Sequence, residues 1–161
     1  MKSNPDFAAI SAVLKENLDL VGSPVAVKIV TAPEQIPAGV PEIEETVRHC
    51  RMISLAREGK IFYATDAKHQ CGGGAWALGL REKGATLKSG EHYYKLGKYE
   101  SLASSRRTME SVPNLPQETY ATMYAPLEKA EFAPDIVMIF AKPKSMLKLA
   151  QSVLFSRGGR I

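Results

Sequence analysis

The sequence lacks long hydrophobic runs and has few cysteines. No stretch approaches the ~20 apolar residues of a membrane-spanning helix, and the first five residues lack the basic and then apolar layout of a signal peptide. The two cysteines, Cys50 and Cys71, cannot form a disulfide framework in a chain of 161 residues. We therefore expect a cytoplasmic protein without membrane contact, in which both cysteines are thiols.

Signatures of nucleotide and nucleic-acid binding are also missing. The glycine run Gly72-Gly73-Gly74 matches neither the P-loop pattern GxxxxGK[ST] nor the dinucleotide fingerprint GxGxxG. The formal net charge of +4 is mildly basic, and the chain has no dense Lys/Arg stripe. This balance suits a small anionic ligand, and we do not expect a nucleic-acid partner.

The composition is that of an ordinary globular protein. Hydrophobic residues make up 45% and charged residues 24% of a chain long enough to bury a sizeable core. The order of predicted helices and strands indicates an α+β or α/β fold, and we expect residues 1–161 to form a single domain with a mixed β-sheet packed by several helices.

Hydrophobic spacing, prolines and capping residues define the predicted elements. Residues 88–99 alternate aromatic, basic and glycine residues without a clean period and are expected to form a loop with one helical turn. Apolar residues of the last predicted helix form a stripe over 146–154, which either joins the core or supports a homo-oligomer. The expected helices are 5–17, 42–57, 75–80, 101–110 and the segment from Pro143, and the expected strands are 25–30, 61–65, 119–124 and 136–140.

Five short motifs together resemble domain of unknown function family 169. They are Gly22-Ser23-Pro24-Val25-Ala26-Val27-Lys28, His49-Cys50-Arg51-Met52, His69-Gln70-Cys71-Gly72-Gly73-Gly74, Leu87-Lys88-Ser89-Gly90-Glu91 and Tyr124-Ala125-Pro126-Leu127-Glu128. The resemblance spans nearly the whole chain and implies an uncharacterised prokaryotic protein. It also implies a longer pattern, with a cysteine-bearing segment after Gly158-Gly159, so the chain is expected to be short at its C-terminal end relative to the family.

Cys71 is the main candidate for chemistry. It precedes three glycines and an apolar helix, so its sulfur is expected near backbone N–H groups that stabilise a thiolate. His69 lies two residues earlier. The structural alternative is that Cys71 is a small buried apolar residue.

Cys50, His69 and Cys71 also form a candidate metal site. Thiolate and imidazole ligands suit zinc, and thiolates also suit an iron–sulfur cluster. His49 is adjacent to Cys50, and neighbours on a helix point in different directions, so both would rarely bind one ion. No CxxC pair and no clear fourth ligand is present.

The glycine run is a candidate anion-binding backbone. Gly72, Gly73 and Gly74 would present N–H groups to a phosphate or carboxylate, with Lys88 as a further ligand-binding residue. The alternative is steric, since glycines permit close packing of a helix on a strand.

Two hypotheses about function follow. In the first, the protein binds a small ligand or takes part in redox chemistry, with Cys71 as the key thiol and Cys50 and His69 beside it. In the second, it is a noncatalytic binding or subunit-like domain with structural cysteines, in which a basic, tyrosine-rich segment meets an anionic partner. That segment contains Lys88, His92, Tyr93, Tyr94, Lys95, Lys98, Tyr99, Arg106 and Arg107.

Overall fold

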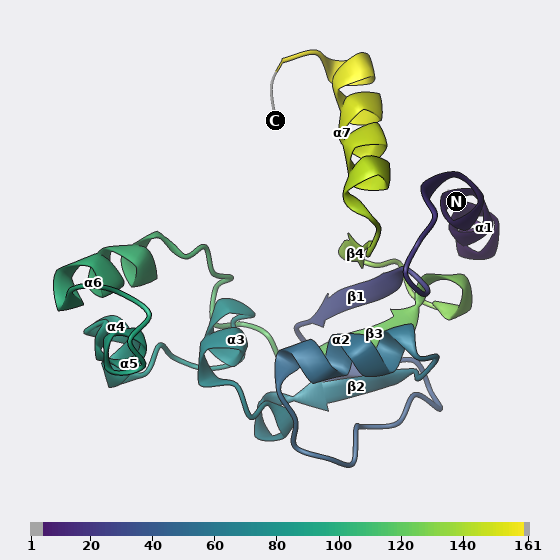
Figure 1. Ribbon diagram of the computed structural model, residues 1–161. Coiled ribbons are helices and arrows are strands. Elements are labelled where there is room, and N and C mark those ends of the chain that lie inside the picture. The colour runs from purple at the N-terminus through teal and green to yellow at the C-terminus, as the bar shows by residue number, and fades with distance from the viewer. Residues whose placement is uncertain (1–4, 160–161) are drawn as a thin grey trace.

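The computed structural model describes residues 5–159 and contains an antiparallel sheet flanked by helices (Figure 1). The spatial order of the strands is β2-β3-β1-β4, and all three pairings are antiparallel. This arrangement confirms the α+β class. In the described residues, the parallel pairing of the expected mixed sheet is limited to two isolated bridges, Glu42–Tyr63 and Val47–His69. The strands are β1 (Val25–Val30), β2 (Phe62–Thr65), β3 (Ala121–Pro126) and β4 (Ile136–Met138).

Seven helices occupy the described part of the chain. Figure 1 shows α2 lying across one face of the sheet, α1 and α7 near β4, and the short helices α4 to α6 gathered at the opposite end. Within residues 5–159, no helix combines the length and the apolar character needed to cross a membrane. The helices are α1 (Phe7–Leu18), α2 (His49–Arg57), α3 (Gly72–Ala77), α4 (Ala85–Lys88), α5 (Glu91–Lys95), α6 (Leu102–Ser111) and α7 (Pro143–Arg157).

Strand β3 is the centre of the core, and all six of its residues are buried. Because side chains alternate along a strand, β3 contributes to two apolar layers. One layer packs beneath α2 and contains Val25, Val27, Met52, Phe62 and Tyr124 among others. The opposite layer packs near α1 and contains Ala26, Val30, Met123, Leu127 and Phe132 among others.

Two predicted helices begin elsewhere in the structure. The helix expected over 42–57 begins at His49, because the preceding residues run extended beside β2 and pair with Tyr63 and His69. The helix expected over 75–80 is α3, which begins at the glycines and ends at Ala77. Residues 88–99, expected to form a loop with one helical turn, contain the end of α4 and the five residues of α5.

Gly90 joins the short helices. Its backbone has a φ of +81°, and an added Cβ would lie 2.6 Å from the backbone nitrogen of Arg106. The hydroxyl of the fully buried Ser105 donates a 2.6 Å hydrogen bond to the Gly90 carbonyl. The motif residue Gly90 therefore allows the start of α5 to touch the backbone of α6.

Glu128 ties α1 to the sheet. Its Oε1 accepts hydrogen bonds from Lys15 Nζ at 2.8 Å and Ser23 Oγ at 2.6 Å, and its Oε2 accepts one from Ser11 Oγ at 2.9 Å. Burial alone would raise the pKa of this carboxyl, but these hydrogen bonds and one from the backbone lower the pKa to about 2. Glu128 is thus ionised throughout the neutral and mildly acidic range.

We expect Gly90→Ala to destabilise the protein by about 2 kcal/mol or more, since it adds a backbone clash to the strain of a positive φ. Gly97→Ala is the matched control, because Gly97 has a φ of +65° with nothing within 4 Å of an added Cβ. Urea unfolding of both variants measures the difference. Equal losses of stability would contradict a special role for the Gly90 contact.

We expect Glu128→Gln to lower the unfolding free energy at pH 7 by about 1–2 kcal/mol, since hydrogen bonds to a charged group contribute on this scale. The folded pKa of Glu128 lies below its unfolded value. The stability it contributes is therefore complete above the unfolded pKa and is lost as the pH falls toward about 2.

Thermal melts between pH 7 and pH 2 measure this effect. The difference between wild type and Glu128→Gln should shrink with acidification, whereas the exposed neighbour Glu131→Gln should follow wild type at every pH. A difference that does not depend on pH would contradict the assignment.

Candidate functional site

A chain of polar side chains crosses the sheet face beneath α2. Thr122 and Tyr124 are two residues apart on β3, so they point to the same face. The Tyr124 hydroxyl lies 3.0 Å from His49 Nδ1, and His69 Nε2 lies 3.2 Å from Thr122 Oγ1. The two imidazole rings are stacked with centroids 6.1 Å apart.

Burial controls the protonation of this chain. Desolvation lowers the pKa of His49, and it lowers the pKa of His69 to about 4 with further contributions from His49 and Arg81 that outweigh Asp66. Desolvation also raises the pKa of Tyr124, so the phenol stays neutral. Both histidines are therefore uncharged at neutral pH, and burial disfavours their protonated forms.

His69 has one nitrogen without a partner. Its side chain is 2% exposed, and Nδ1 has no hydrogen-bond partner among the described residues. If Nε2–H donates to Thr122, Nδ1 carries a lone pair rather than a buried proton, which costs less free energy. His69 is thus bound to the sheet through one ring nitrogen, Nε2, which contacts Thr122.

Cys71 caps the first turn of α3, as expected for a residue ahead of the glycines. Its side chain is partly buried, and Sγ accepts a hydrogen bond from the Gly74 N–H at 3.4 Å. A Cβ at Gly74 would lie 3.5 Å from this Sγ and 3.3 Å from the Cβ of His49. Gly74 therefore lets α3 pack against His49, and Cys71 and His49 lie on two sides of the same glycine.

A cavity of about 660 Å³ opens beside Cys71. Gly72 and Gly73 lie at its wall, and the Tyr93 hydroxyl would be 3.5 Å from a Cβ at Gly73. The other lining residues come from the start of α2, from the segments just before and after α3, and from the segment of α4 and α5. They are Arg48, Gln70, Cys71, Arg81, Glu82, Gly84, Thr86, Leu87, His92, Tyr93 and Leu96.

Two arginines and one acid, Glu82, line the cavity. Arg81 is anchored, because Nε donates to Asp66 Oδ1 at 2.5 Å and Nη2 donates to the Asp66 and His69 carbonyl oxygens at 2.8 and 3.1 Å. Arg48 is exposed and forms no ion pair with the residues described. Its guanidinium group is therefore free to meet an anion.

The structure separates the other predicted site residues. Cys50 is exposed on α2, whereas the ring of His69 is buried against Thr122. Lys88 is not among the lining residues and lies 3.9 Å from Glu82 in an exposed ion pair. Of the three expected glycines, Gly72 and Gly73 line the cavity, and Gly74 packs on His49.

The metal site stays a prediction. Within residues 5–159, no three His, Cys, Asp or Glu side chains are grouped closely enough to hold an ion. Elemental analysis of protein purified without oxygen tests for zinc or an iron–sulfur cluster at Cys50, His69 and Cys71.

Two bases of the basic, tyrosine-rich segment pair with acids of the same segment. Lys95 pairs with Glu91 at 2.7 Å, and Arg106 pairs with Glu110 at 3.3 Å. These contacts join residues four apart on one helix, which is a common pattern on solvated helix faces. An anionic partner on this surface also stays a prediction.

Sequence reasoning missed four residues of the site. Thr122 and Tyr124 lie within an apolar strand. Two polar side chains at alternate positions of such a strand indicate a polar contact on one face of the sheet. No local sequence pattern indicates that Arg48 or Arg81 belongs to the site. Arg48 precedes the motif of His49 and Cys50 by one residue, and Arg81 follows the glycine run by seven.

Comparison with known proteins finds relatives without an assigned activity. Residues 13–161 match the family model of domain of unknown function family 169, described as uncharacterised ArCR. The curated Uncharacterized protein MJ0308 of Methanocaldococcus jannaschii is 41% identical over 138 residues, which are 84% of this chain and 59% of that protein. The chain thus spans about three-fifths of the length of this relative. No solved structure matches the chain.

We expect His69 to remain neutral down to about pH 4 in the folded protein. Its folded pKa lies below its unfolded value, so its neutral burial contributes stability above the unfolded pKa that is lost as the pH falls toward 4. NMR titration of the three histidine side chains, assigned with a His69→Gln variant, measures this pKa. A His69 resonance that titrates near pH 6.5 would mean that the ring is solvated.

Proposed function

This chain belongs to domain of unknown function family 169, as its motifs predicted, and we propose that it binds a small anionic molecule in the cavity beside Cys71. The observation that carries the proposal is the meeting of a thiol and two guanidinium groups at one cavity. The ligand we propose has a carboxylate or phosphate group and an apolar or planar body.

The size and lining of the cavity support a small molecule. A volume of about 660 Å³ falls in the usual range of small-molecule sites, which combine apolar walls with a few placed polar groups. Leu87, Tyr93 and Leu96 supply apolar surface. Arg48 and Arg81 supply positive charge beside the acidic Glu82, and Arg81 is already oriented by its hydrogen bonds to Asp66.

Cys71 is proposed as the group that contacts the ligand. Cys71 lies at the start of α3 and lines the same cavity as Arg48 and Arg81. Its Sγ accepts a hydrogen bond from the Gly74 N–H. His49, bonded to Tyr124, packs against Gly74 near Cys71.

Competing alkylation tests the proposal. Iodoacetate is an anion and iodoacetamide is its neutral counterpart, so their rate ratio at Cys71 reports the charge of the cavity. In a Cys50→Ser background, we expect Arg48→Ala to lower this ratio two- to fivefold, since removing one nearby partly solvated charge alters the interaction by about 0.5–1 kcal/mol. Peptide mass spectrometry locates and quantifies the label.

Arg51→Ala is the matched control, because Arg51 lies on the same helix but outside the cavity lining and pairs with Glu58 at 2.9 Å. Its ratio should equal that of the Cys50→Ser parent. Labelling of Cys71 only after unfolding, or equal ratios in all three proteins, would leave the proposal without support.

A further inference from the structure

The charged side chains of the cavity beside Cys71 differ in whether they have a partner. The lining contains two bases and one acid, Arg48, Arg81 and Glu82. Arg81 pairs with Asp66 at 2.5 Å, and Glu82 pairs with Lys88 at 3.9 Å. Among the described residues, Arg48 has no acidic partner. The positive charge of Arg48 is therefore the one that a ligand can compensate.

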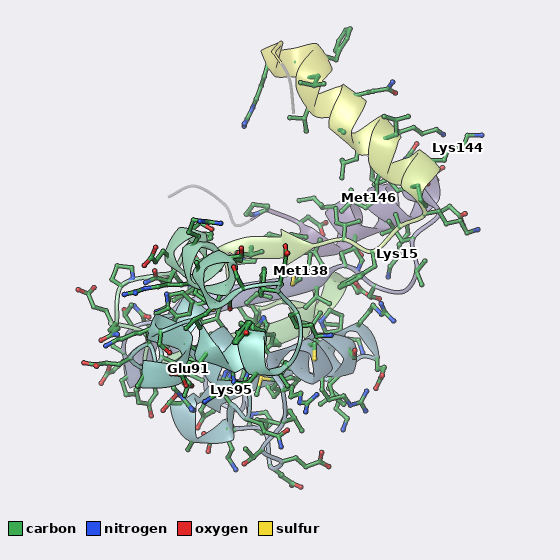
Figure 2. The ribbon with its side chains drawn as sticks, turned by 60° about the vertical axis from the view of Figure 1, so that its left-hand side comes forward. Lys15, Glu91, Lys95, Met138, Lys144 and Met146 are labelled. Atoms are coloured by element: carbon green, nitrogen blue, oxygen red, sulfur yellow. The ribbon has the colours of Figure 1, made fainter. Side chains whose placement is uncertain are left out.

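The two charges of helix α5 do not alter this balance. Glu91 and Lys95 pair with each other at 2.7 Å, and neither is among the lining residues. Figure 2, which turns the short helices toward the viewer, shows both side chains there. The charged lining residues and their ion-pair partners thus comprise three bases and two acids, which gives this group a net charge of +1.

Arg81 has few hydrogen-bond donors left for a ligand. A guanidinium group has five N–H groups. Three of them are used, one by Asp66 Oδ1 and two by the carbonyl oxygens of Asp66 and His69. The remaining two belong to a single nitrogen, Nη1. Arg48, which has no acidic partner among the described residues, can instead present two parallel N–H groups to one anionic group.

Building on the proposed function, we infer that the ligand is a monocarboxylate with an apolar body and not a phosphate ester. A carboxylate carries one negative charge, which equals the net positive charge of the group, and its two oxygens suit the fork of Arg48. A phosphate monoester carries a charge of about −2 above pH 7. Its second charge would stay uncompensated beside apolar walls, which is unfavourable.

The apolar lining supports the second half of this inference. Leu96 is 58% exposed, so an apolar ligand body that covers it would remove hydrophobic surface from water. The Tyr93 ring extends from α5 toward α3, since its hydroxyl lies 3.5 Å from the position of a Cβ at Gly73. A phenyl group or a short alkyl chain on the carboxylate would meet both side chains.

Protection of Cys71 from iodoacetamide tests the inference. Three probes share a phenyl body and differ in charge: 3-phenylpropionate, 2-phenylethyl phosphate and the neutral 3-phenylpropionamide. In the Cys50→Ser protein at pH 8, we expect 3-phenylpropionate to give half-protection at a concentration about threefold or more below that of either other probe, on the scale of one partly solvated charge. Peptide mass spectrometry quantifies the label on Cys71.

Glu82→Gln tests the charge argument directly. It removes one acid from the lining, so protection by 2-phenylethyl phosphate should improve about two- to threefold more than protection by 3-phenylpropionate. Glu110→Gln is the matched control, because Glu110 is also an exposed acid in an ion pair, with Arg106 at 3.3 Å, but lies outside the lining. It should leave the ratio of the two probes unchanged.

The possible failures of this inference and of the proposed function differ. Stronger protection by the phosphate than by the carboxylate, or an equal effect of Glu82→Gln and Glu110→Gln, would overturn the monocarboxylate and leave an anion site in place. Equal protection by all three probes would overturn both. An absence of protection by every probe, with an iodoacetate preference that still depends on Arg48, would overturn the monocarboxylate alone.

Discussion

The hydrogen bond between Tyr124 and His49 fixes the site on the core. Tyr124 is fully buried in the central strand, and a buried hydroxyl without a partner would be costly, so the start of α2 must deliver His49 to it. Thr122, two residues away on the same face, holds His69 in the same manner. Both cysteine-bearing segments are therefore held by side chains of the same strand, β3. The position of Cys71 thus depends on how the sheet is packed.

Local patterns in the sequence predicted the elements better than the site. The β-branched run over Val25–Val30 and the capping role of Cys71 before the glycines depend on neighbouring residues, and both appear in the structure. The segment before His49 has the acidic residues of a helix start, but its pairing with β2 is a long-range contact that no local pattern contains. His49, rather than His69, packs across Gly74 beside Cys71 for the same reason, because Tyr124 lies 75 residues away.

The family motifs have separate structural and functional parts. Ser23 and Glu128 belong to two motifs far apart in sequence, and their 2.6 Å hydrogen bond explains why both residue types are needed. Gly90 in a third motif is required by the contact with α6. The motif of Cys71 differs from these, since Gln70, Cys71, Gly72 and Gly73 line the cavity, as does Arg48, the residue before the motif of His49. A family resemblance alone does not make this distinction.

The cavity is bounded by two groups of elements that have separate packing. Arg48 and Cys71 are held by the sheet and α2, whereas Leu87 and Tyr93 belong to the group of α4 to α6, which packs mainly on itself. Two backbone hydrogen bonds, from Leu115 to Ala77 and from Thr119 to Gly79, hold together the two chain segments that connect these groups. A ligand that touches both walls would thereby favour one relative orientation of the two groups. Under the proposed function, ligand binding in the cavity and the relative orientation of the two groups would therefore be coupled, so that each restricts the other.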